Sequence, residues 1–316
     1  MTDRNAGASI SDQSAKRINV STLCCHKHLG MAEQSIKTVV GYNSINSIIV
    51  HDDGSLKEPD RHRLCNLSEK VKILTREEAD DRVSPTLTKY PKCLAFRNSN
   101  VYGLKLFDIA LLANEWLNYF DTDVLFFDDP ALIYNREDAI DLVGMRDFIS
   151  GVAIEKKNLR FVAPLASRFN AGLMQVKREA YDLEYIEFIL GSQFNQRQEW
   201  IEQTCWSALA MRVNSALWDF RRVCMGNSKH VASKSTVAAH FASWQGRERF
   251  DSFAANTSGT NRVGSTKNVL ANPIKRLTYT QYCLENAKRR VRRWQRKLRK
   301  RFAAHPLLDP ALLVDR

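Results

Sequence analysis

The sequence has no run of about 18 apolar residues, so no membrane-spanning helix is expected. Residues 1–16 are polar and lack the apolar core of a secretory signal, and we expect them to form a disordered leader. No segment recurs at a period of about 20 to 50 residues, which argues against solenoids and propellers. The seven cysteines include no C-x-x-C pair, so neither a disulfide framework nor a zinc site is expected. Reduced thiols of this kind are typical of a cytoplasmic protein.

Composition and charge place the chain among globular proteins. It has 316 residues, 44% hydrophobic and 26% charged, which is enough for one large domain or two small ones. The net charge is +12, but residues 286–302 alone contain ten Lys or Arg and no acidic residue. Without those ten charges the rest of the chain carries only +2. The body therefore gives no reason to expect nucleic acid as a partner, and the basicity belongs to one C-terminal segment.

Hydrophobic periodicity predicts alternating strands and helices in the first 75 residues. The predicted strands are 18–24, 46–50 and 71–74, and the predicted helices between them are 31–42 and 60–68. This order predicts parallel strands with helices on the faces of the sheet, and so an α/β fold. Further along the chain we expect a helix over 104–116 and short strands over 173–176 and 237–241.

The segment Asp121-Thr122-Asp123 stands between two apolar runs, at the predicted end of a strand. Two carboxylates this close repel each other unless a cation lies between them, and Mg²⁺ or Mn²⁺ fits such oxygen ligands. Open α/β sheets bind their ligands at the carboxyl ends of strands, where this segment is predicted to lie. The alternative is a solvated loop or a helix cap, because D-x-D is frequent by chance.

Residues 120–126 resemble the D-x-D strand of nucleotide-sugar glycosyltransferases with the GT-A fold. Other motifs follow in the order typical of the glycogenin and bacterial lipooligosaccharide galactosyltransferase group. They are the acidic turn Asp52-Asp53-Gly54-Ser55, Lys105, the segment Phe169-Asn170-Ala171-Gly172-Leu173, the pair Glu202-Gln203, and His240. The resemblance covers roughly residues 18–250. It implies a GT-A-like catalytic domain over 17–271, with a mixed, mainly parallel sheet flanked by helices.

The same resemblance implies an enzyme and its substrates. We expect a hexosyltransferase that moves a sugar from a nucleoside-diphosphate donor, with UDP-hexose favoured, to a saccharide or lipid-linked glycan. Retention of the anomeric configuration is slightly favoured over inversion. We expect Mn²⁺ or Mg²⁺ to be held by Asp121, Asp123 and His240. The implied donor-binding residues are Asp52, Asp53, Arg97, Lys105, Thr122, Gly172, Gly246 and Arg247. The residues implied to act beside the reacting sugar are Gln203, Glu202 and Asn170.

The sequence departs from the group's pattern in two places, and several candidates have structural alternatives. Glu202 stands where the group has Asp, and the sequence after His240 lacks the group's Gly…Lys-Pro-Trp pattern, which leaves the phosphate role of Gly246 and Arg247 open. An Asp-Gly sequence also forms ordinary Asx turns. A lone lysine is often a surface residue of a helix, and a lone histidine is often a satisfied core residue.

The C-terminal segment is predicted to form a basic amphipathic helix over 272–304, followed by a tail over 305–316. Asn272 would cap this helix and Pro273 would occupy its first turn. The residues Val291, Trp294, Leu298 and Phe302 recur at helical spacing. An apolar stripe bordered by cations is typical of helices on anionic membranes. We therefore expect a peripheral protein on the cytoplasmic face of the inner membrane, the alternative being a nucleic-acid-binding arm.

Two other readings of the whole chain remain. Asp121-Thr122-Asp123-Val124 also fits the nucleophile motif of haloacid-dehalogenase-like phosphatases, but those enzymes place it near the first strand and need a later acidic motif. A non-catalytic membrane- or nucleic-acid-binding protein with a structural acidic triplet is the other alternative. Metal-dependent nucleotide binding would separate a glycosyltransferase from that alternative.

Overall fold

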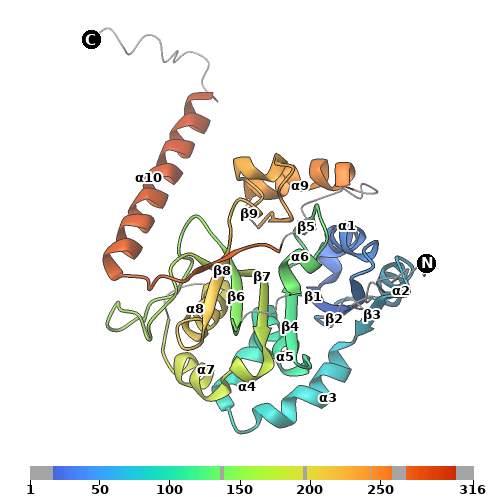
Figure 1. Ribbon diagram of the computed structural model, residues 1–316. Coiled ribbons are helices and arrows are strands. Elements are labelled where there is room, and N and C mark those ends of the chain that lie inside the picture. The colour runs from blue at the N-terminus through green and yellow to red at the C-terminus, as the bar shows by residue number, and fades with distance from the viewer. Residues whose placement is uncertain (1–16, 136–138, 195–197, 243, 258–267, 304–316) are drawn as a thin grey trace, which may run out of the picture.

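The computed structural model describes residues 17–135, 139–194, 198–242, 244–257 and 268–303 (Figure 1). The predicted leader over 1–16 and the tail over 305–316 lie outside these residues. The described strands are β1 (Ile18–Cys24), β2 (Ile45–Asp52), β3 (Val71–Leu74), β4 (Trp116–Phe120), β5 (Val124–Phe126), β6 (Leu142–Arg146), β7 (Phe169–Lys177), β8 (Ser215–Trp218), β9 (Val223–Met225), β10 (Ala238–His240) and β11 (Ala271–Pro273). The described α-helices are α1 (Leu29–Val40), α2 (Glu58–Cys65), α3 (Arg76–Leu87), α4 (Pro91–Ser99), α5 (Val101–Leu112), α6 (Ala131–Tyr134), α7 (Leu183–Leu190), α8 (Gln198–Leu209), α9 (Trp244–Thr257) and α10 (Tyr279–Ala303).

An eight-stranded sheet runs through the molecule in the order β11-β8-β6-β7-β4-β1-β2-β3. Strands β1 to β4, β6 and β8 run in one direction, whereas β7 and β11 run antiparallel to their neighbours. The mixed, mainly parallel sheet predicted from the sequence is therefore confirmed. Because β1, β2 and β4 are parallel, their carboxyl ends meet at one edge of the sheet, where the acidic turns follow.

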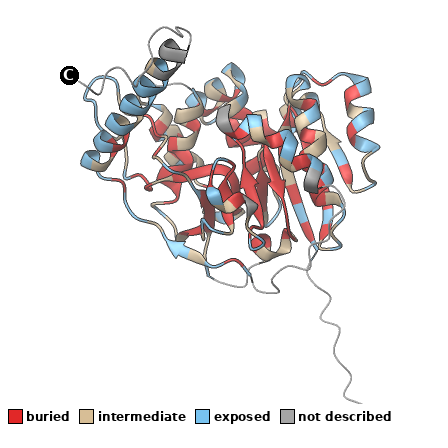
Figure 2. Cartoon of the chain, turned by 90° about the horizontal axis from the view of Figure 1, so that it is seen from above, coloured by how far each residue is buried: buried red, intermediate tan, exposed pale blue. Residues whose placement is uncertain are grey.

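Each face of the sheet carries its own apolar core, and Figure 2 shows the strands as the most buried part of the chain. One core joins β4 and β7 side chains to α5, α7 and α8 through residues such as Leu117, Met174 and Trp206. The other joins β1 and β2 to α1 and α2 through residues such as Ile36 and Leu64. Helices thus cover both faces, as the alternating pattern predicts.

A second, three-stranded sheet β5-β10-β9 stands beyond the end of β4. Strand β10 is antiparallel to β5, with His240 opposite Val124, and parallel to β9, with His240 opposite Met225. This ladder places His240 next to the residue that follows Asp123, although the two are far apart in the sequence.

Local signals in the sequence explain where the helices near the site begin. The Thr75 hydroxyl accepts a hydrogen bond from Glu78 N at 3.2 Å, and Glu78 Oε2 accepts one from Thr75 N at 2.8 Å, which forms a capping box at α3. The Asn100 side chain accepts a hydrogen bond from Gly103 N at 3.1 Å and caps α5. This cap fixes the first turn of the helix that carries Lys105.

Two predicted helix boundaries differ most from the structure. The helix predicted over 104–116 ends at Leu112, because the backbone becomes extended at Ala113 and Trp116 begins β4. The C-terminal helix begins at Tyr279 rather than at Asn272, because Asn272 and Pro273 pair with β8 as strand β11. Strand pairing across the sheet therefore overrides the local capping signal.

His51 makes stability depend on pH. Its ring is buried in β2, and Nδ1 has no hydrogen-bond partner among the described residues. Burial lowers the pKa of His51 to about 3. The unfolded chain takes up a proton near pH 6.5 while the folded chain does not, so stability is complete above that pH and falls as the pH falls towards 3.

When the pH is lowered from 7.5 to 5, we expect the unfolding free energy to fall by about 2 kcal/mol less in His51→Gln than in the wild type. Urea unfolding at both pH values measures this difference. His62→Gln serves as the control, because the His62 side chain is 71% exposed. An equal pH dependence in His51→Gln and the wild type would rule out this account.

Candidate functional site

The acidic triplet forms the turn between β4 and β5. Asp121 N donates to Gly172 O on β7 at 2.7 Å, and Val124 N donates back to Asp121 O at 3.0 Å. The Tyr119 hydroxyl donates to Asp121 Oδ1 at 2.5 Å. These bonds fix the backbone of the turn and the Asp121 carboxylate. Thr122, which stands between the two aspartates, is buried.

His240 completes a group of three potential metal ligands with Asp121 and Asp123. Its Nε2 lies 3.0 Å from Asp123 Oδ1 and 3.5 Å from Asp121 Oδ2, and one ligand atom from each residue lies within 4.8 Å of the others. Burial works against the charged form of Asp123, but His240 and Arg247 hold the pKa of this carboxyl below its usual value. Asp123 is therefore ionised at neutral pH, as a metal ligand must be.

The orientation of the His240 ring fits metal coordination. Nδ1 lies 3.1 Å from Asn170 Oδ1, whereas the buried Nε2 makes no hydrogen bond among the described residues. If Nδ1–H donates to Asn170, the lone pair of Nε2 points at the two carboxylates. Gly172 makes this ring position possible, because a Cβ there would lie 2.0 Å from His240 Cε1. The three residues thus fit a divalent cation with oxygen and imidazole ligands.

Asn170 links this group to a carboxylate that sequence reasoning missed. Its Nδ2 donates to Asp147 Oδ2 at 2.9 Å, and its Oδ1 also accepts from Gly172 N at 2.8 Å. Asp147 directly follows β6, and burial raises the pKa of its carboxyl despite the bond from Asn170. An acidic residue after a short apolar run is the same signal that identified Asp121, and it could have found Asp147.

Lys105 lies between two carboxylates behind the triplet. Its Nζ is 3.1 Å from Asp121 Oδ1 and 3.6 Å from Glu202 Oε1. Burial favours the neutral amine, but Asp121 and Glu202 raise the pKa of Lys105 above its usual value, so the amine is charged. Burial raises the pKa of Glu202 to about 7, against the influence of Lys105. Lys105 is thus a buried cation at the site, not a surface residue.

Gln203 supports the start of β7. Its Oε1 accepts from Ala171 N at 3.1 Å, and its Nε2 donates to Phe169 O. The side chain therefore holds the segment that carries Asn170 and Gly172. Glu202, its neighbour, faces Lys105 instead.

The acidic turn after β2 is held largely by its own hydrogen bonds. Asp52 Oδ1 accepts from Gly54 N, Asp52 Oδ2 accepts from Arg61 at 2.9 Å, and Asp53 Oδ1 accepts from Ser55 N. The Asx-turn alternative thus describes both carboxylates. Gly54 has φ +95°, a conformation that favours glycine.

His28 was not singled out from the sequence, and charges of both acidic segments act on its imidazole. Burial lowers the pKa of His28, Arg247 lowers it further, and Asp123 and Asp53 act in the opposite direction. Carboxylates of the turn after β2 and of the acidic triplet thus both influence this imidazole. The location of His28 just beyond the carboxyl end of β1 is the signal that could have found it.

The remaining donor-binding candidates divide into two groups. Arg247 NH2 lies 4.0 Å from Asp123 Oδ2 at the start of α9, and Gly246 is buried against the Phe241 backbone, where a Cβ would lie 2.8 Å from Phe241 O. Arg97 does not join the site. Its buried guanidinium is bound by Asp108 and Asp80 on neighbouring helices, so it has a structural role.

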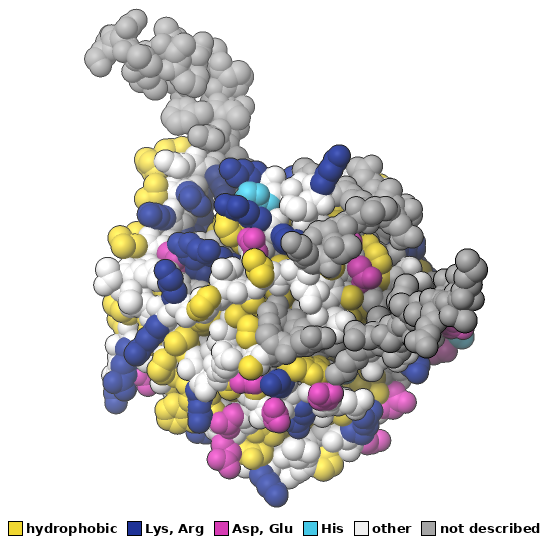
Figure 3. Space-filling model, in the orientation of Figure 1, with side chains coloured by type: hydrophobic (Ala, Val, Ile, Leu, Met, Phe, Trp, Pro, Cys, Tyr) yellow, Lys and Arg dark blue, Asp and Glu magenta, His cyan; other side chains and the backbone are white. Residues whose placement is uncertain are grey.

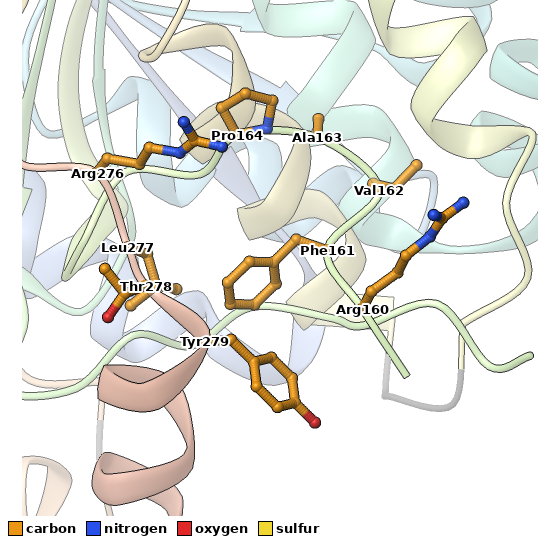
Figure 4. A pocket seen from close by; sticks show the side chains of 9 residues that line it. All are labelled: Arg160, Phe161, Val162, Ala163, Pro164, Arg276, Leu277, Thr278 and Tyr279. Carbon is orange, nitrogen blue, oxygen red and sulfur yellow. The ribbon is translucent and has the colours of Figure 1, made fainter. Parts of the chain in front are cut away.

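Two of the cavities formed by the described residues can be compared with this site. One, of about 170 Å³, is lined by Arg146, Asp147, Phe148, Arg168, Phe220, Cys224, Met225 and Ser228. The other, of about 660 Å³, lies between residues 160–164 and 276–279 at the start of α10 (Figure 4). None of the candidate site residues lines the larger cavity, whereas the smaller one contains Asp147, the partner of Asn170.

No family model matches the chain, and no curated protein matches it. Among solved structures, the apo form of the glycosyltransferase GlyE from Streptococcus pneumoniae TIGR4 aligns with 78% of this chain and 61% of GlyE, with a TM-score of 0.51 and 10% identity. The bifunctional glycosyltransferase WbbM aligns with 77% of this chain and 50% of WbbM, with a TM-score of 0.50 and 11% identity. The galactosyltransferase LgtC, bound to donor and acceptor sugar analogues, aligns with 77% of this chain and 97% of LgtC, with a TM-score of 0.47 and 13% identity.

The likeness to GlyE and WbbM is a likeness of fold, and it identifies the fold as that of GT-A glycosyltransferases. The resemblance indicated by the sequence motifs is thereby confirmed at the level of the fold. The phosphatase alternative, which rests on the D-x-D segment alone, has no support from this architecture.

Proposed function

We propose that the protein is a metal-dependent glycosyltransferase that uses a nucleoside-diphosphate sugar, with UDP-hexose as the expected donor and a saccharide or lipid-linked glycan as acceptor. The observation that carries this proposal is the buried His240 Nε2, which lies 3.0 Å from Asp123 Oδ1 and 3.5 Å from Asp121 Oδ2. Bound Mn²⁺ or Mg²⁺ would stabilise the negative charge of the departing nucleoside diphosphate. The GT-A fold supports the same reaction class.

The surrounding side chains have roles that follow from their contacts. Lys105 holds the Asp121 carboxylate in place from behind the site. Arg247, half-exposed beside Asp123, is positioned to meet donor phosphates. Asn170 fixes the His240 ring, and Gly172 leaves room for it. Gln203 acts by holding β7 in place.

Calorimetric titration of UDP and UDP-hexoses, with Mn²⁺ and with EDTA, tests the proposal. We expect UDP to bind in Mn²⁺ and to lose most of its affinity in EDTA. If no nucleotide binds, either with Mn²⁺ or with EDTA, the proposed function is wrong.

We further propose that α10 brings the enzyme to an anionic membrane surface. The helix extends away from the body in Figure 1, and dark blue Lys and Arg side chains gather on that side in Figure 3. Within the described part of the helix, Val291 and Trp294 are exposed, Trp294 by 62%. Arg276 adds a cation beside the start of the helix (Figure 4). None of the described helices is long and apolar enough to cross a membrane.

Replacing Arg290, Arg292, Arg293 and Arg296 together by glutamine should weaken binding to phosphatidylserine-containing vesicles at least about 100-fold, because each basic residue near such a surface contributes about 1 kcal/mol. Vesicle sedimentation at low and high salt measures the loss. The control Leu270→Ser removes an exposed apolar side chain outside α10 and should leave binding unchanged. Equal binding of the wild type to neutral phosphatidylcholine vesicles would refute the electrostatic explanation.

A further inference from the structure

The lining of the 170 Å³ cavity includes two residues that connect it to His240. Met225, in its wall, is the strand partner of His240. Asp147, also in its lining, accepts the Asn170 hydrogen bond, and Asn170 in turn holds the His240 ring. A molecule that enters this cavity therefore lies within two side chains of the proposed metal-binding residues.

The walls of the cavity suit a sugar ring. Phe148 and Phe220 are 47% and 38% exposed, which is unusual for large apolar side chains placed beside one small cavity. A pyranose has one apolar C–H face and a rim of hydroxyl groups, so it can pack on an aromatic ring while its hydroxyls meet polar groups such as Asp147. The volume is below the roughly 300–1,000 Å³ of pockets for drug-sized ligands, so one ring-sized group fits.

Two arginines give the cavity its charge. The Arg146 guanidinium lies 5.5 Å from the centre of the Phe220 ring and has no carboxylate partner among the described residues. Arg168 Nε is 2.9 Å from Glu285 Oε1 on α10, so its charge is balanced. Asp147 is in the same lining, but its carboxylate accepts a hydrogen bond from Asn170 rather than from Arg146. Arg146 is thus the one cation of the lining with no balancing partner described.

The backbone around Arg168 is strained. Its φ is +57°, a region that costs a non-glycine residue about 1 kcal/mol or more. The strained residue is held at both backbone groups: Arg168 N donates to Ser150 Oγ at 3.1 Å, and Arg168 O accepts from Asp147 N at 2.8 Å. These bonds hold Arg168 and Asp147 in the lining of the same small cavity. The ion pair between Arg168 and Glu285 connects this lining to the first turns of α10.

On the basis of the proposed glycosyltransferase function, we propose that this cavity is the acceptor subsite and that Arg146 selects a saccharide acceptor that carries a phosphate or carboxylate group. The aromatic walls take the sugar ring, Asp147 orients a hydroxyl group of the acceptor, and Arg146 meets the anionic group with charge-assisted hydrogen bonds. The anion can belong to an acidic sugar or to the phosphate of a lipid-linked or phosphorylated glycan.

Ligand-observed NMR titrations, with UDP and Mn²⁺ present, test this proposal with three probes. Methyl glucuronoside carries a carboxylate, glucose 1-phosphate carries a phosphate, and methyl glucoside is neutral. We expect at least one anionic probe to bind about tenfold more tightly than methyl glucoside, as one charge-assisted hydrogen bond would give. Preference for the phosphate probe alone identifies a phosphorylated acceptor, and preference for the carboxylate probe alone identifies an acidic sugar.

The Arg146→Gln variant should lose the preference for the anionic probe and keep its affinity for methyl glucoside. The matched control is Arg63→Gln, which removes an arginine of α2 that does not line the cavity. Equal affinities for all three probes in the wild type, or an unchanged preference in Arg146→Gln, would overturn the inference. UDP binding in the same samples separates the two claims: if UDP binds but no anion preference exists, only the acceptor inference fails, whereas absent UDP binding refutes the proposed function.

Discussion

The Asp123→Asn variant is expected to lose metal-dependent UDP binding and at least about 100-fold of its transfer rate. Loss of an outer-shell partner of a metal ligand already costs about 10- to 100-fold in affinity or activity, and Asp123 is placed as a ligand itself. The amide removes the negative charge that faces His240 Nε2 at 3.0 Å and Arg247 at 4.0 Å. Calorimetry with and without Mn²⁺ measures the binding, and release of UDP from the donor measures the rate.

The control for this experiment is Asp251→Asn, which makes the same chemical change at an exposed position of α9. It should behave as the wild type in both assays. Thermal unfolding without metal checks that the Asp123 variant is folded. If folded Asp123→Asn retained full, Mn²⁺-dependent UDP binding, the assignment of Asp123 as a metal ligand would be wrong.

The Arg97→Ala variant is expected to be destabilised by about 3–5 kcal/mol, the usual loss when one partner of a buried ion pair is removed. Arg97 is only 1% exposed, and its Nε and NH2 lie 2.5 and 2.9 Å from the two oxygens of Asp108. Burial already raises the pKa of Asp108 although Arg97 opposes it, so loss of Arg97 leaves a buried carboxylate without its main partner. Urea unfolding at pH 7.5 measures the change.

Two comparisons show whether the ion pair is the cause. Arg63→Ala removes an arginine that is 57% exposed and paired with Glu33 at 2.8 Å, and it should cost less than about 1 kcal/mol. The double variant Arg97→Met with Asp108→Leu should be less destabilised than Arg97→Ala, because no charge remains buried. A double variant as unstable as Arg97→Ala would show that packing, rather than charge, explains the loss.

The sequence was sufficient for those parts of the fold whose signals are local. Strands β1 and β3 have the bounds predicted for them, because each is a short apolar run between polar turns. Strands β6, β8 and β9 were not predicted, since they have only three to five residues each and are specified by their partners in the sheets. The sequence misplaces the start of α10 for the same reason, because Asn272 and Pro273 pair with β8.

The candidate site likewise contains residues that the sequence predicts and residues whose contacts only the structure reveals. The sequence motifs predict the group of Asp121, Asp123 and His240, and the structure brings these three residues together. The sequence alone does not place Arg97, because its partners Asp80 and Asp108 lie on other helices. The apolar run before Asp147 could have marked it as a candidate, but a single sequence does not reveal its contact with Asn170 on β7.

The pairing of β5 with β10 determines when the site can form during synthesis. This ladder places His240 beside the two carboxylates and joins segments far apart in the chain. Contacts between distant segments form only after the intervening chain is available. A nascent chain that has not yet released β10 from the ribosome therefore presents both aspartates without their histidine. The candidate site is therefore complete only after β10 has been synthesised, when most strands of the large sheet are already available.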